Sequence, residues 1–87
     1  MHAVLVTVTI DDREAAAKQV RDVVAPQVRQ APGHVAGFWT RKGSSGTSIV
    51  VFESEQAADA MAAKVPAMVP DQVTLESVEV REVVARS

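Results

Sequence analysis

The sequence predicts a ferredoxin-like α+β fold in a single domain covering residues 1–87, with the element order β-α-β-β-α-β. Three observations predict this fold. Four segments are β-branched and apolar, and they alternate with a period of two or are apolar throughout. Two segments carry apolar residues at helical spacing. A glycine-rich and serine-rich stretch joins the second and third β segments, as in a hairpin. This order gives a four-stranded antiparallel sheet with two helices on one face.

The first strand is predicted over Met1–Ile10, where one face is apolar and β-branched: Val4, Val6, Val8 and Ile10. Asp11 as an N-cap, with Glu14 three residues later, resembles a capping box and predicts the start of the first helix. The apolar stripe of this helix is expected to contain Ala16, Ala17, Val20, Val23 and Val24.

Pro26 lies inside this helical pattern, although an interior proline removes a hydrogen bond and kinks or stops a helix. The residues after it still look helical. We therefore expect a kinked or restarted last turn with Val28 at least partly buried. The dipeptide Pro32–Gly33 is a strong stop signal and predicts the end of this segment.

The second and third strands are expected over Val35–Lys42 and Thr47–Glu53, joined by a loop longer than two residues at Gly43–Gly46. The register of this hairpin stays open. A five-residue loop places Trp39 on the face of Ile49 and Val51, and a four-residue loop places it with Val50 and Phe52.

Ser54 is a favourable N-cap for the second helix, which is expected to end at Pro66. Its apolar stripe contains Ala57, Ala58, Met61, Ala62 and Val65. The last strand is expected over Val73–Val84. Its apolar residues change from odd to even numbers, which predicts a β-bulge or a break near Glu76–Ser77.

Composition excludes several classes of protein. The chain contains no cysteine, so it has neither disulfides nor thiolate metal ligands. A net charge of −2 gives no electrostatic reason to expect nucleic acid or an anionic membrane as a partner. No apolar run approaches the roughly 20 residues of a transmembrane helix, and the N-terminus lacks the basic region of a signal peptide. We therefore expect a cytoplasmic protein.

Two helices cover only one face of such a sheet, yet the run Ile49–Phe52 is apolar on both faces. Leu5, one side of this run and one phase of the last strand are expected on the helix-free face. Exposure of several such side chains would cost several kcal/mol, at roughly 25 cal/mol per Å². The sequence therefore predicts a homodimer formed through the helix-free face.

Four segments together resemble the dimeric α/β-barrel superfamily, in particular its small proteins related to antibiotic biosynthesis monooxygenases: Val4–Val8, Ala25–Gly33, Val35–Trp39 and Ser48–Ala58. The resemblance implies that two subunits form the barrel. It also implies a pocket in each subunit, either between the sheet and the helices or opening toward the barrel interior.

Members of this superfamily include cofactor-free oxygenases that form quinones, haem-degrading enzymes and isomerases. For the oxygenases, the resemblance implies an asparagine, a tryptophan and either a tyrosine or a haem-ligating histidine. This chain has no asparagine, no tyrosine and no histidine between Ala57 and Val69. Neither catalytic set is complete, and no cofactor is expected.

Two residues are weak catalytic candidates. His34 is a candidate general base, because histidine is the residue type that most often transfers protons near neutral pH, but a solvent-facing loop histidine is the simpler interpretation. Glu53 is a candidate buried acid, although an electrostatic partner for the first turn of the helix is simpler. No metal site is expected, because His2 and His34 have no further ligands at suitable spacing.

The candidates for a ligand pocket are Trp39, Phe38, Phe52 and Arg41. Trp39 would stack on a flat aromatic molecule, or else fill the core or the dimer interface. Two functions remain. The favoured one is a non-catalytic domain that binds a small molecule or a partner. The alternative is a cofactor-independent enzyme, similar to a monooxygenase or an isomerase, that acts on a small and possibly aromatic molecule.

Overall fold

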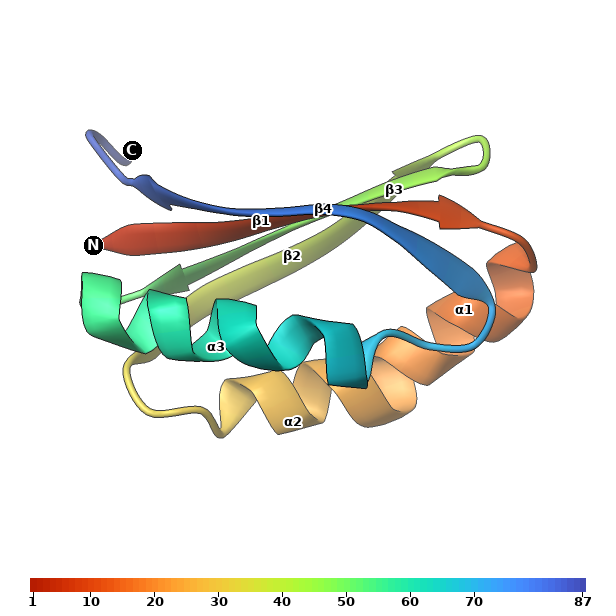
Figure 1. The fold of residues 1–87 in the computed structure, drawn as a ribbon, viewed down its shortest axis with the longest axis horizontal. Coiled ribbons are helices and arrows are strands. Elements are labelled where there is room, and N and C mark those ends of the chain that lie inside the picture. Colours follow the sequence, from red (N-terminus) through yellow and green to blue (C-terminus); the bar gives the residue numbers. More distant parts are fainter.

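The computed structural model describes all residues, 1–87, and has its helices packed on one face of a four-stranded antiparallel sheet (Figure 1). The strands lie in the order β2-β3-β1-β4. They comprise β1 (His2–Ile10), β2 (His34–Lys42), β3 (Ser45–Phe52) and β4 (Val73–Glu82). The helical segments are α1 (Arg13–Gln19), the π-helical η1 (Val20–Val24), α2 (Ala25–Arg29) and α3 (Glu55–Met68). The predicted ferredoxin-like order of elements is confirmed.

Side-chain caps fix where the helices begin. Asp12 Oδ1 accepts a hydrogen bond of 3.1 Å from the Ala15 amide, so Asp12 is the N-cap of α1 and the prediction of Asp11 was wrong by one residue. Glu14 is therefore one position too early for a capping box. Ser54 Oγ accepts a bond of 3.1 Å from the Ala57 amide, which confirms Ser54 as the N-cap of α3.

A π turn accommodates Pro26. The segment η1 immediately precedes α2, and the Ala25 amide donates to the Val20 carbonyl, five residues earlier. Helical structure continues on both sides of the proline and Val28 is only 4% exposed, as predicted. The π turn changes the phase of the helix, because it holds more residues than an α turn. Val23 is therefore exposed and does not belong to the apolar stripe.

The prediction that the second helix ends at Pro66 was wrong, because α3 continues to Met68. A proline at this position removes one amide donor, the one that would bond to the Ala62 carbonyl. The Met68 side chain packs against the hydrophobic core and holds the last turn in place. No helix of the protein is both long and apolar enough to cross a membrane.

The β2–β3 hairpin has a two-residue turn, shorter than the sequence predicted. Lys42 pairs with Ser45, and Gly43 takes a left-handed φ of 61° between them. Glycine at the first central position is typical of a tight type II′ turn. In this register Trp39 is opposite Ser48 and shares the face of Val50 and Phe52. Of the two alternatives left open, the structure therefore agrees with the one in which Trp39 lies with Val50 and Phe52, although the turn has two residues and not four.

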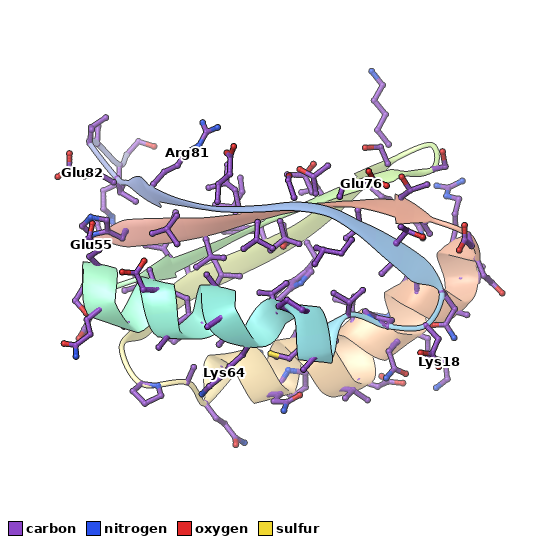
Figure 2. The ribbon with its side chains drawn as sticks, in the orientation of Figure 1. Lys18, Glu55, Lys64, Glu76, Arg81 and Glu82 are labelled. Atoms are coloured by element: carbon purple, nitrogen blue, oxygen red, sulfur yellow. The ribbon has the colours of Figure 1, made fainter.

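The predicted β-bulge in the last strand is confirmed. Thr7 pairs with Ser77 but Val8 pairs with Leu75, so Glu76 is the extra residue. The bulge turns the apolar residues on both of its sides toward the helices: Val73, Leu75, Val78 and Val80. The prediction that one apolar phase of β4 lies on the helix-free face was therefore wrong. That face of β4 instead carries charged side chains, among them Glu76 and Arg81 (Figure 2).

The core lies between the sheet and the helices, around the fully buried side chains of Phe52 and Val4. On the other face, Leu5 pairs with Ile49 and Ile49 pairs with Phe38. Leu5 therefore lies on the helix-free face, as predicted. Phe38 is 64% exposed and Ile49 is 39% exposed. The next cross-strand row on this face, Ala3, Val51 and Ala36, is also apolar, so the two rows together form an apolar centre on the helix-free face.

A candidate ligand-binding cavity

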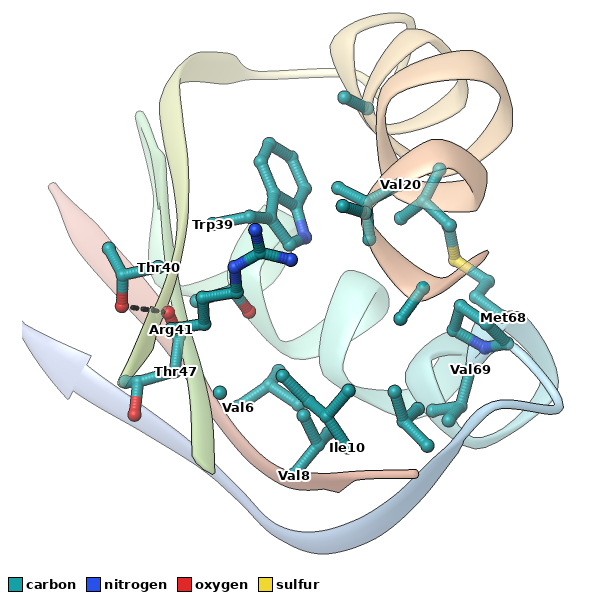
Figure 3. Close-up of a pocket in the computed structure, with 18 of the residues that line it drawn as sticks. Val6, Val8, Ile10, Val20, Trp39, Thr40, Arg41, Thr47, Met68 and Val69 are labelled. Carbon is teal, nitrogen blue, oxygen red and sulfur yellow. Dashed lines mark hydrogen bonds between the residues drawn. The ribbon is translucent and has the colours of Figure 1, made fainter. Parts of the chain in front are cut away.

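A cavity of about 480 Å³ lies between the sheet and the helices (Figure 3). Of its 25 lining residues, 17 are hydrophobic. One wall is the inward face of β1, formed by Val4, Val6, Val8 and Ile10. The facing wall comes from α1 and η1, and the lining also includes Met68, the last residue of α3, and Val69, its C-cap.

Small residues on both walls leave this volume unfilled, although protein interiors normally pack as densely as organic crystals. Ala16 and Ala17 of α1 extend only a methyl group toward the sheet. Gly46 of β3 is required by its neighbours, because a Cβ atom there would lie 2.9 Å from Val8 Cγ2. Side chains of β1 therefore occupy the space beside Gly46. The space between the sheet and the two alanines of α1 stays unfilled.

Trp39 and Ser48 supply the polar groups of the interior wall. They are paired on the neighbouring strands β2 and β3, and both side chains point into the cavity. Gly37 makes room for the indole, because a Cβ atom there would lie 3.1 Å from Trp39 Cζ3. Neither the indole N–H nor the Ser48 hydroxyl forms a hydrogen bond within the chain. Neither is a fully enclosed polar atom, so both keep some accessible surface.

The mouth of the cavity is basic. Among the lining residues only four are exposed, and three of these are arginines: Arg13, Arg21, Thr40 and Arg41. The Arg41 side chain reaches into the opening beside Trp39 (Figure 3). Its Nη1 donates a hydrogen bond of 2.9 Å to the Arg13 carbonyl, and its Nη2 lies 3.7 Å from Glu14 Oε1.

The cavity offers binding groups but no acid–base pair. Its lining contains no histidine, aspartate, glutamate or lysine. An arginine stays protonated in proteins, so it does not exchange protons near neutral pH. No group of three histidine or carboxylate side chains in the protein is arranged to hold a metal ion. The arrangement can hold an apolar molecule and attract negative charge at its mouth.

Both catalytic candidates lie outside the cavity lining. His34 is the first residue of β2, so it is not a loop histidine, and its ring meets Phe52 edge-on with centroids 6.1 Å apart. Glu53 is exposed after the end of β3, so it is not a buried acid; its amide donates to the Gly33 carbonyl.

Two of the four pocket candidates, Trp39 and Arg41, line the cavity. Phe38 does not, because neighbouring residues of a strand point to opposite faces and Phe38 precedes Trp39. Phe52 is enclosed in the core beyond the cavity. Sequence reasoning missed Ser48 and the other two arginines. The pairing of Ser48 with Trp39 would have identified it, had the register been known.

No family model matches the sequence, and no curated protein matches it significantly. Solved structures do match in shape. The structure of MupZ from Pseudomonas fluorescens has a TM-score of 0.70 at 17% identity, over 91% of this chain and 69% of MupZ. A monooxygenase, ActVA-Orf6 of Streptomyces coelicolor in complex with nanaomycin D, has a TM-score of 0.63 at 19% identity. The match covers 99% of this chain and 92% of the monooxygenase chain.

A third structure is the haem-degrading protein MhuD of Mycobacterium tuberculosis with two haems bound. Its TM-score is 0.54 at 20% identity, over 97% of this chain and 98% of MhuD. At such identities the likeness concerns the fold alone. The chain shares its fold with these three proteins, and the predicted resemblance is confirmed at the level of the fold.

Proposed function

We propose that this protein is a non-catalytic binding protein that holds a small, largely apolar molecule in the cavity between its sheet and its helices. The cavity itself carries this proposal. Its volume of about 480 Å³ falls within the roughly 300–1,000 Å³ of small-molecule sites, and 17 of its 25 lining residues are hydrophobic. Trp39 provides a flat apolar surface on one wall, which suits a planar ligand.

The chemistry of the lining favours binding over catalysis. Positioned acid–base groups typically contribute ~10²–10⁴-fold to a rate, and the lining contains only arginines as ionisable groups. The asparagine and tyrosine that the family resemblance would require are absent from the whole chain. A bound molecule would therefore meet an apolar wall, an indole and a serine hydroxyl, none of which is activated by a neighbouring base.

Fluorescence tests the proposal directly, because Trp39 is the only tryptophan. The uncharged probe N-phenyl-1-naphthylamine should quench Trp39 emission and brighten on binding. Val20 lines the cavity, so Val20→Phe should fill part of it and weaken binding about tenfold or more. Val23→Phe is the matched control, since Val23 belongs to the same segment but is exposed outside the lining. Equal binding by both variants would contradict the proposal.

A second candidate function is a cofactor-independent enzyme, similar to a monooxygenase or an isomerase, acting on a small aromatic molecule. The likeness in fold to a monooxygenase and to a haem-degrading protein supports it. Incubation with aromatic ligands under dioxygen, followed by mass spectrometry, distinguishes the two functions. Titration with haem, followed at the Soret band, tests whether the protein binds and degrades haem. Turnover at enzymatic rates that is lost in Trp39→Leu or His34→Ala would favour the enzyme.

We also propose that the protein forms a homodimer through its helix-free face. The cross-strand row of Leu5, Ile49 and Phe38 supports this assembly. A second copy offers the same row, as a closed two-fold interface requires. The flanking β4 carries both signs of charge, with Glu79 paired to Arg81, so two copies need not repel each other at that edge.

A further inference from the structure

We propose that the ligand is an amphipathic organic anion, with its apolar body against Trp39 and its acidic group on Arg41. This inference rests on the proposed binding function and specifies its ligand class. The acidic group is a carboxylate, a sulfonate or a phosphate, because these present the oxygen pairs that a guanidinium binds.

The distribution of charge around the cavity supports this class. All three charged lining residues are arginines, and all three belong to the exposed rim at Arg13, Arg21 and Arg41. Apart from the Trp39 indole N–H and the Ser48 hydroxyl, the interior wall is apolar. Such an arrangement matches a molecule with one anionic end that stays near the solvent and an apolar end that enters the cavity. A cation would meet three like charges at the same rim.

The acidic residues nearest the rim lie outside the cavity and leave Arg41 available. Glu14 is 3.7 Å from Arg41 Nη2, but its side chain is 88% exposed and absent from the lining. Asp22 is paired with Lys18 on the outer surface. The other contact of Arg41 is to the neutral carbonyl of Arg13, which fixes the side chain without cancelling its charge. A guanidinium has five N–H donors, so donors remain for a ligand.

The two unpaired polar groups inside the cavity refine the ligand further. The Trp39 indole N–H is a donor, and the Ser48 hydroxyl is both donor and acceptor. A purely hydrocarbon body would bury both without a partner, which is unfavourable. A carbonyl or hydroxyl oxygen on the ligand body would satisfy them. The ligand class is therefore an oxygenated, largely apolar acid.

A matched pair of probes tests the charge preference. 1-Anilinonaphthalene-8-sulfonate carries one sulfonate on the scaffold of the uncharged N-phenyl-1-naphthylamine. Wild-type protein should bind the sulfonate roughly tenfold more tightly, as expected for a charge-assisted hydrogen bond. Arg41→Gln should abolish this preference, so that the variant binds both probes with similar affinity. Lys42→Gln is the control, because Lys42 is the adjacent cation but does not line the cavity.

The neutral probe also reports whether the variant is folded, since it needs the same cavity. The preference of the wild-type protein should decrease as sodium chloride is added, because a charge at an exposed rim is screened. Equal affinity of the wild-type protein for both probes, or an unchanged preference in Arg41→Gln, would overturn the inference alone. Two other outcomes would overturn the proposed function itself: the neutral probe does not bind, or Val20→Phe does not weaken its binding.

Discussion

Arg41 Nη1 donates a hydrogen bond to the backbone carbonyl of Arg13 across 2.9 Å, which joins an edge strand to the first residue of α1. The two residues are 28 positions apart in the chain. The Arg41 side chain therefore spans the mouth of the cavity from the sheet to the helices. One contact therefore bridges the sheet and α1 at the opening and places one of the three arginine charges there.

The proposed dimer predicts that a charge on the helix-free face dissociates the protein. Phe38→Glu should convert a dimer into a folded monomer in analytical ultracentrifugation at micromolar concentration. Burial of an unpaired carboxylate at an apolar interface should weaken association by about a hundredfold or more, or ~3 kcal/mol. The monomer should stay folded, because Phe38 is 64% exposed within one subunit.

The matched control is Val23→Glu, which places the same charge on an exposed apolar residue of the helical side. This variant should remain dimeric. If the wild-type protein sediments as a monomer, or Phe38→Glu remains dimeric, the helix-free face is not the interface.

Periodicity made most of the fold predictable. The alternation in Met1–Ile10 identifies a strand with one buried face, and the change of phase near Glu76 identifies the bulge. The hairpin turn was not predictable, because four turn-forming residues in succession at Gly43–Gly46 permit several loop lengths. The end of α3 depended on the packing of Met68, which no local pattern reveals.

The site was less predictable than the fold. Trp39 and Arg41 share one face of β2 and both line the cavity, and the sequence named both as pocket candidates. Phe38 was grouped with Trp39 because it is aromatic, although adjacent residues of a strand face opposite ways. The arginine rim depends on how closely α1 approaches the sheet. That distance is a property of tertiary packing, and no spacing within the chain encodes it.

Replacement of the proline inside α3 should stabilise the protein. Pro66 is exposed and lacks the amide that would bond to the Ala62 carbonyl, so Pro66→Ala should restore this bond. The free energy of unfolding should rise by ~1–3 kcal/mol, measured by urea denaturation. Pro32→Ala, in the exposed turn before β2, is the control and should lower stability by up to ~1 kcal/mol through the unfolded state. Loss of stability in Pro66→Ala would show that the proline is required for the last turn.

The ion pair on the outer surface of the helix predicts a specific change in acid titration. Lys18 Nζ lies 2.8 Å from Asp22 Oδ2, and this hydrogen bond, followed by the lysine charge, lowers the pKa of Asp22 below its ordinary value of 3.8. Any stability from the pair is therefore present above pH 3.8 and is lost as the pH falls through the lower pKa of the folded protein. Both side chains are exposed, so salt should screen the effect strongly. Lys18→Gln should raise the Asp22 pKa toward 3.8, as measured by NMR of its carboxyl carbon, whereas Lys64→Gln should not. An identical Asp22 titration in the wild-type protein and Lys18→Gln would mean that the pair does not persist in solution.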